Sequence, residues 1–262
     1  MSHRPTRREF SALALAFLAA GRESARAQGE PAKPAGAPAA GRLPGPDPIP
    51  PDPRGLPVLP TVPVRHGAQP FNVQMIDTSL LPRDKQGIWV LDFGFKQLRI
   101  YSVEIGGKRR LVHYLYYRVI NRTGNPRDFV PQFTLVTDTG KRYEESVIPK
   151  AVGLIQARED PTIRLLGPVD VVGVIPPCKK ATVDDAVFGV AMWEGIDPHA
   201  DRMSIYIRGL SDGYQEVPAP DGGKPVVRYK TLRIDLIRRG DARNLSEKEI
   251  TLAEPSYEWI YW

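Results

Sequence analysis

Residues 111–121 read LVHYLYYRVIN, a dense run of β-branched and aromatic residues. Such residues pack well on a pleated, half-buried surface, so this stretch predicts a central strand. Residues 133–137 (FTLVT) follow, and they lead through the turn DTGK at 138–141 into Arg142 and Tyr143. Two strand-like runs joined by a short turn that contains glycine predict a β-hairpin. The centre of the chain is therefore expected to consist of antiparallel strands.

Strand-like segments continue on both sides of this centre. Turn residues separate them and most connections are short, a pattern that favours an antiparallel two-sheet sandwich over a parallel α/β sheet. The further segments are residues 88–93, 98–105, 169–175, 186–193, 203–208, 226–237 and 257–262. We expect the side chains of Tyr117, Val119, Leu135 and Val190 to face the core, and the aromatic residues of the last segment to close it.

One helix is predicted among the strands, over residues 150–159. Pro149 suits the first turn of a helix, where its missing N–H costs no hydrogen bond. Ile148, Val152 and Ile155 recur at the spacing that places side chains on one helical face. The expected fold class is therefore all-β, an antiparallel β-sandwich with one short helix.

Residues 1–27 have the three parts of an export signal: a basic start, a short apolar stretch and a small-x-small cleavage site. Arg7, Arg8 and Phe10 match the twin-arginine pattern, and Ala25 and Ala27 frame the cleavage site. An ordinary secretory route remains the alternative. The apolar stretch is roughly half of the ~20 residues needed to cross a bilayer, so no permanent transmembrane segment is predicted. We expect a periplasmic or secreted protein.

The remaining chain divides by composition. Residues 28–69 are crowded with Pro, Ala and Gly, as in PGPDPIPPDP at 44–53, and lack apolar periodicity. Proline has no backbone donor and favours extended neighbours, so this segment predicts a disordered, polyproline-like linker. Residues 70–262 carry the strand segments and are assigned to one β-sandwich domain.

Charge and cysteine content exclude several classes of protein. Removing the signal takes away five basic and two acidic residues and lowers the formal net charge from +6 to +3. The remaining Lys and Arg are scattered in short runs, so nucleic acid is not an expected partner. Cys178 is the single cysteine of the chain, so no intrachain disulfide can form and the fold must rely on its core.

Four stretches resemble exported bacterial immunoglobulin-like domains of the telokin-like type. They are YRVINRTG at 117–124, FTLVTDTGKRY at 133–143, GVIP at 173–176 and FGVAMW at 188–193. Residues 88–262 as a whole resemble an uncharacterised family of exported bacterial proteins with a Trp-Glu-Gly-x-Asp-Pro loop and an aromatic end. The resemblance implies an immunoglobulin-like sandwich outside the cytoplasm, and it carries over no catalytic residue.

The loop GIDPHAD at residues 195–201 places Asp197, His199 and Asp201 at alternate positions. Carboxylate and imidazole groups with this spacing could converge on a divalent ion if the loop is extended. The same residues fit a turn in which the Asp197 side chain bonds its own backbone ahead of Pro198. The turn is the favoured interpretation, so these three residues are only metal candidates and no cofactor is predicted.

His113, Cys178, His199 and Met203 occur in the chain order of a blue-copper site. In cupredoxins the Cys and the second His share one short loop, whereas Cys178 and His199 are 21 positions apart. The two lysines that follow Cys178 could lower the pKa of its thiol, but a buried or inert thiol is the favoured interpretation.

Beyond the signal the chain has three histidines, His66, His113 and His199, so it is poor in general bases and nucleophilic hydrolysis is not predicted. The expected function is a non-catalytic interaction or structural module, with a protein or another cell-envelope component as its partner. The alternative is a metal-binding protein or metal-dependent enzyme centred on Asp197, His199 and Asp201.

Mass spectrometry of the exported protein should find Gln28 at or near its N-terminus. Changing both Arg7 and Arg8 to Lys should block export, because the paired arginines are the twin-arginine address. Unchanged export of this variant would assign the secretory route instead. A mature protein that retains residues 10–20 would contradict the signal altogether.

Overall fold

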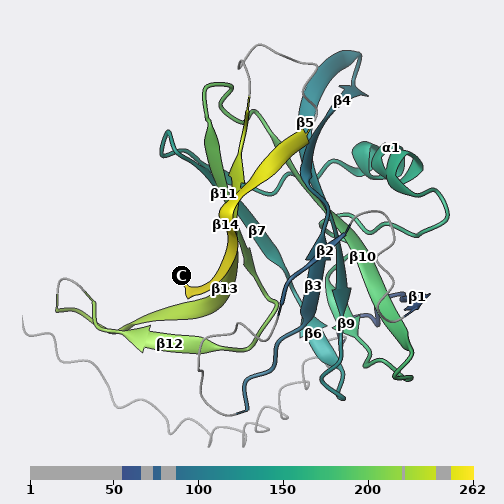
Figure 1. The fold of residues 1–262 in the computed structure, drawn as a ribbon, viewed down its shortest axis with the longest axis vertical. Helices are drawn as coiled ribbons and strands as arrows, with labels where there is room; N and C mark the ends of the chain where they lie inside the picture. Colours follow the sequence, from purple (N-terminus) through teal and green to yellow (C-terminus); the bar gives the residue numbers. More distant parts are fainter. Residues whose placement is uncertain (1–54, 66–72, 78–86, 220–221, 240–248) are drawn as a thin grey trace, which may run out of the picture. The chain divides into compact units, whose positions relative to one another are not determined.

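The computed structural model describes residues 55–65, 73–77, 87–219, 222–239 and 249–262 (Figure 1). This part of the chain consists mostly of antiparallel β-strands, with one α-helix among the described residues. The predicted all-β class is therefore confirmed. The signal residues Arg7, Arg8, Phe10, Ala25 and Ala27 lie outside the described residues, as does most of the predicted linker.

The described residues contain fourteen strands and helix α1. Their bounds are β1 (Val62–Arg65), β2 (Gln74–Met75), β3 (Asp92–Phe95), β4 (Leu98–Ile105), β5 (Lys108–Ile120), β6 (Arg127–Phe129), β7 (Gln132–Thr137), β8 (Arg142–Glu144), α1 (Pro149–Glu159), β9 (Gly173–Ile175), β10 (Val183–Glu194), β11 (Arg202–Arg208), β12 (Tyr214–Val217), β13 (Val226–Ile237) and β14 (Glu249–Tyr261).

Twelve strands form one hydrogen-bonded path, in the order β1-β10-β5-β4-β14-β13-β11-β7-β8, with β12 beside β13 and with β3 between β2 and β5. The path folds over at β14 into two layers (Figure 1). We call β1, β2, β3, β4, β5 and β10 the first layer, and β7, β8, β11, β12 and β13 the second layer. Strands β6 and β9 form a separate two-stranded sheet.

Strand β14 belongs to both layers. Its first two residues pair with Arg99 and Leu98 of β4 in the first layer. From Thr251 to Tyr261 it runs antiparallel to β13 in the second layer, with a register shift on the way. One strand therefore joins the two sheets by backbone hydrogen bonds.

Aromatic rings fill the space between the layers. Phe93 and Tyr117 of the first layer meet Phe133 of the second, with ring centroids 6.5 Å and 4.8 Å from it. Val119 and Leu135 are fully buried in the same cluster. The structure confirms the prediction that Tyr117, Val119 and Leu135 face the core.

The opposite face of the first layer is buried too, under α1 and the segment that follows it. Ile148, Ala151 and Ile155 pack there against strand residues that include Phe188 and Val190. Val190 is thus buried as predicted, but against the helix and not between the layers. A strand buried on both faces carries apolar residues at successive positions, so its alternation cannot indicate which side a residue occupies.

Helix α1 begins at Pro149 and ends at Glu159, one residue longer than predicted. Ile148 and Ile155 are buried and Val152 is partly buried, as their spacing indicated. Ala151 and Glu159 complete the face that meets the first layer. The proline at the start and the apolar spacing together account for the position of the helix.

Part of the predicted linker belongs to the fold. Residues 62–65 form β1, which pairs antiparallel with β10 from Val62 opposite Ala186 to Arg65 opposite Val183. Leu59 is buried in the core between the layers. The assignment of residues 28–69 to a disordered linker is therefore wrong for residues 55–65, because residues 62–65 satisfy the backbone groups on the edge of β10 and Pro57 and Leu59 exchange backbone hydrogen bonds with Val174.

Several other boundaries differ from expectation, including the starts of β5 and β10, which lie three residues before the predicted ones. Residues 169–171 form a turn, and only residues 173–175 of that segment are a strand. Strand β3 begins at Asp92 and not at residue 88, whereas β14 begins at Glu249, eight residues before the predicted last strand.

Gly189 lies opposite Tyr117, and a Cβ atom at this position would overlap the Tyr117 ring. Gly189→Ala should therefore lower the free energy of unfolding by about 1–3 kcal/mol, the usual cost of overpacking a core. Gly153 is the matched control, because it lies on α1 and an added Cβ meets nothing within 4 Å. Gly153→Ala should leave stability unchanged or raise it by up to ~1 kcal/mol. Equal effects of the two variants in urea unfolding would contradict this packing.

Candidate binding surface

The loop that carries Asp197 forms the turn expected as the alternative to a metal site. Asp197 Oδ1 accepts a hydrogen bond from the backbone N–H of His199 at 3.0 Å. Its Oδ2 accepts bonds from Lys141 Nζ at 2.9 Å and Thr139 Oγ1 at 3.3 Å. These bonds, that of Lys141 first, lower the pKa of Asp197 to about 2. The carboxylate therefore already holds its own loop to the β7–β8 turn.

The three metal candidates do not converge. His199 and Asp201 are exposed, and the backbone N–H of Asp201 donates to Asp138 Oδ2 at 3.2 Å. In the part of the chain that the structure describes, no group of three or more His, Cys, Asp and Glu side chains is placed to hold a metal ion.

The residues in blue-copper order are also dispersed. Met203 lies in the core between the layers, whereas Cys178 packs at the opposite face of the first layer. His113 is buried in β5, and neither ring nitrogen has a hydrogen-bond partner among the described residues. Burial, helped by the charge of Arg238, lowers the pKa of His113 to about 4. This histidine is therefore a neutral core residue.

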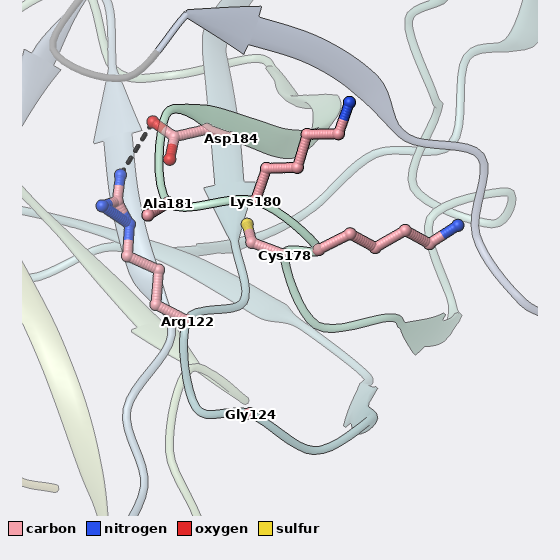
Figure 2. Close-up of a pocket in the computed structure, with 7 residues that line it drawn as sticks. Arg122, Gly124, Cys178, Lys180, Ala181 and Asp184 are labelled. Carbon is pink, nitrogen blue, oxygen red and sulfur yellow. Dashed lines mark ion pairs between the residues drawn. The ribbon is translucent and has the colours of Figure 1, made fainter.

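Cys178 lines a pocket of about 230 Å³ (Figure 2). The other lining residues are Arg122, Gly124, Lys179, Lys180, Ala181 and Asp184. Arg122 Nη2 pairs with Asp184 Oδ2 across the pocket at 2.8 Å, and the backbone N–H of Asp185 donates to Cys178 Sγ at 3.3 Å. Burial raises the pKa of the thiol, and the two aspartates add to this effect. The pKa thus shifts opposite to that expected of a reactive cysteine beside lysines.

A buried ionic cluster joins the end of α1 to the first layer. Glu159 Oε2 accepts a bond from Lys96 Nζ at 2.7 Å, and Oε1 accepts bonds from Arg99 Nη1 at 2.7 Å and Tyr114 OH at 2.6 Å. Burial alone would raise the pKa of Glu159, but the bonds from Lys96 and Tyr114 and the charges of Lys96 and Arg99 lower it overall. Removal of the Glu159 carboxylate, or of the cations that pair with it, would leave the remaining charge without an opposite charge nearby.

The run GLSDG at residues 209–213 has the Gly-x-Ser-x-Gly spacing of a hydrolase nucleophile elbow. That elbow needs a strand followed by a helix, whereas this run lies between strands β11 and β12. Ser211 Oγ donates to the carbonyl of Trp89 at 2.7 Å and accepts the N–H of Gly213 at 3.1 Å. The serine therefore ties β12 to the chain before β3 and does not form a nucleophile elbow.

The outer face of the second layer carries stacked aromatic and cationic side chains. Along β11, Ile205 and Ile207 point into the core, so Tyr206 between them points outward. Trp262 stacks on Tyr206 with ring centroids 4.5 Å apart. The Arg142 guanidinium lies 4.9 Å from the centroid of the Trp262 ring. The indole is therefore held on this face, outside the core.

Strand β12 and the start of β13 form a two-stranded ribbon beside this part of the sheet (Figure 1), and it carries two further tyrosines. The Arg208 guanidinium lies 4.2 Å from the Tyr229 ring centroid, and Tyr229 lies opposite Tyr214. Tyr214 and Tyr229 are 54% and 45% exposed. We call the set Arg142, Tyr206, Arg208, Tyr214, Tyr229 and Trp262 the aromatic face.

Strand registry explains why these residues share a face. Tyr229 and Trp262 exchange two backbone hydrogen bonds, at 3.2 Å and 3.1 Å, so they are directly opposite each other. Trp259 lies three residues earlier on the same strand and therefore points to the other side, where it is buried. The expectation that the aromatic residues at 257–262 close the core is thus confirmed for Trp259 and wrong for Trp262.

Comparison with protein-family models, curated proteins and solved structures finds no match to this chain. Of the helices in the described residues, none has the length and apolar character required to cross a membrane.

Glu145 follows directly after β8 and is a partly buried carboxyl on the same side of the strand as Tyr143, which packs against the core. Its Oε1 has no hydrogen-bond partner within the described residues, and burial raises the pKa of Glu145 to about 8. Tyr117, whose hydroxyl is also buried without such a partner, is close enough for its pKa to be raised further by the Glu145 charge. The folded protein therefore keeps Glu145 protonated near neutral pH.

The stability of the protein should decline as pH rises from about 6.5 to 8. In this range the folded state retains a proton on Glu145 that the unfolded state, with a carboxyl pKa near 4.5, has released. His113 acts in the opposite direction, and only between pH 6.5 and about 4. Glu145→Gln should flatten the decline in urea unfolding, whereas Glu144→Gln, an exposed neighbour, should retain it. A decline that persists in Glu145→Gln would exclude this cause.

Proposed function

We propose that this protein is an exported, non-catalytic binding module that contacts a protein partner through the aromatic face. One observation carries the proposal: Trp262 stacks on Tyr206 and lies within 4.9 Å of the Arg142 guanidinium on the outer side of a sheet that also carries the exposed Tyr214 and Tyr229. The proposed location outside the cytoplasm rests on the signal-like sequence of residues 1–27.

The residue types on the aromatic face are those that dominate binding energy at protein interfaces. Trp, Tyr and Arg are enriched among the residues whose truncation weakens complexes most. Tyr and Trp offer a large apolar area with few rotatable bonds, so little side-chain entropy is lost on binding. The stacking of Arg142 and Tyr206 on Trp262 restricts these side chains before any partner arrives.

Folding alone gives no reason for aromatic side chains on this face. The solvated side of an antiparallel sheet normally carries polar residues, because an exposed ring gains little of the free energy that its burial would supply. The same sheet follows this rule elsewhere, as at Ser204, Arg233 and Asp235, which bond one another through Asp235. The aromatic face departs from the rule, since Tyr214 and Tyr229 are exposed and Tyr206 and Trp262 are partly exposed. Exposed apolar surface of this kind is typical of interaction sites.

The alternative function, a metal-binding protein or metal-dependent enzyme, is less well supported. Asp197 is engaged by Lys141 and by the turn, and His199 and Asp201 do not approach it as a cluster. The Cys178 pocket has a thiol of raised pKa and an arginine paired with Asp184. Neither the Asp197 loop nor the Cys178 pocket combines a cavity with a set of side chains available to bind a metal ion.

A photo-crosslinking residue tests the proposal at two positions of equal exposure. Tyr229 on the aromatic face and Leu154 on α1 are both 45% exposed. With p-benzoylphenylalanine at these positions in cells, position 229 should give a discrete protein adduct and position 154 should not. Trp262→Ala should reduce the yield at position 229 by about tenfold, the effect of losing roughly 1.4 kcal/mol of binding.

The control measurement is the thermal melt of each variant, since Trp262→Ala must retain the fold for its effect to be assigned to binding. Equal adducts at both positions, or an adduct at position 229 that survives both Trp262→Ala and Arg142→Ala, would refute the aromatic face as the binding surface.

A further inference from the structure

Strand β12 (Tyr214–Val217) lies at a sheet edge. Among the described residues it pairs only with β13, from Tyr214 opposite Tyr229 to Val217 opposite Val226. Tyr214, Gln215 and Glu216 are all exposed. A strand with one unpaired side presents a row of backbone donors and acceptors to any strand that approaches it.

The neighbouring hydrogen bonds determine which backbone groups point outward. The N–H of Lys230 donates to the carbonyl of Gly213 at 2.8 Å, so Gly213 faces β13. Backbone groups alternate in direction along a strand, so Gln215 and Val217 face β13 as well. The N–H and C=O groups of Tyr214 and Glu216 therefore point away from β13, and no hydrogen bond from them to another described residue is found.

We infer that the edge of β12 pairs with the same edge of a second copy of this chain, around a two-fold axis at Gln215. Antiparallel pairing centred there places Tyr214 of each copy opposite Glu216 of the other. Both residues carry outward backbone groups, so each such pair exchanges two N–H···O bonds and the two copies form four. A two-fold axis requires this self-complementarity.

Charge and shape favour a second copy over an unrelated strand. The pairing sets the carboxylate of Glu216 against the phenol ring of Tyr214, and it opposes no like charges directly. On this side of the combined sheet the cross-strand row becomes Tyr229, Tyr214, Glu216 and Val227, which covers the exposed edge of the Tyr214 ring. Pro218 has no N–H and follows directly after the strand, so the pairing ends after these four bonds. The dimer is therefore a small and weak one.

The two-fold axis lies perpendicular to the combined sheet, so both copies keep the same side of the sheet outward. The two aromatic faces then lie on one side of the dimer. If the proposed binding function holds, a repetitive or dimeric partner would be bound at two points, and its apparent affinity would exceed that of one face. The pairing itself does not depend on that function.

Charge substitution at the axis gives a test specific to this register. Residue 215 of one copy lies opposite residue 215 of the other only in the proposed pairing. The purified wild-type protein should show a monomer–dimer equilibrium by sedimentation velocity between ~10 μM and ~1 mM, the range of weak interfaces. Gln215→Lys and Gln215→Glu should each raise the dimer Kd by up to about fivefold through like-charge contact. An equal mixture of the two variants should restore dimerisation.

The control variant is Leu154→Lys, which adds the same charge at an exposed position on α1 and should leave the Kd unchanged. Glu216→Pro removes an outward N–H at an edge position and should abolish dimers while the thermal melt is retained. A protein that stays monomeric to ~1 mM would overturn the inference. A dimer whose Kd is the same for Gln215→Lys, for Gln215→Glu and for their mixture would also overturn it, because its interface would then lie elsewhere. If a variant that no longer dimerises still gives the partner adduct at position 229, partner binding and β12 pairing are independent of each other.

Discussion

The passage of the Tyr117 ring across Gly189 is the contact on which the rest of the structure depends. The ring is fully buried, it meets Phe93 in its own layer and Phe133 in the other, and it leaves no room for a side chain at position 189. The strand pair β5 and β10 is thereby packed tightly on the side of the second layer. Its other side is covered by α1, which the buried Glu159 attaches to Lys96 and Arg99. Both layers and the helix are therefore arranged around one strand pair that is buried on both faces.

The predictability of the fold from sequence follows from how local each signal is. Strands β4, β11 and β13 have one solvated side or clear flanking turns, and their predicted bounds agree with the structure within a residue. Pro149 marks the start of α1 in the same local way. The short strands β1, β2, β6 and β12 have weak patterns of their own, because their pairing is decided by the edges that they meet. The direction of Val190 was not predictable either, since successive residues of β10 are buried.

The same distinction separates the two candidate sites. The Asp197 turn is local, two residues from side chain to backbone N–H, and residue types alone predicted it. The aromatic face combines Arg142, Tyr206, Tyr229 and Trp262 from four strands, so it follows only from the register of β13 with β11 and β14. No spacing in the sequence reports that register. The buried state of Glu145 is hidden for the same reason, because its neighbours arrive from other strands.

The double membership of β14 has a consequence for how the molecule loses its structure. Its first two residues pair with one end of β4 and its remainder pairs along β13, so each layer loses backbone partners if the other separates from it. Separation of the layers would expose the unpaired edges of both and open the shared aromatic core at the same time. In the described fold, one layer therefore cannot unfold without removing backbone and core contacts from the other. We expect the two layers to melt as one cooperative unit, with far-ultraviolet and near-ultraviolet circular dichroism lost in a single coincident transition.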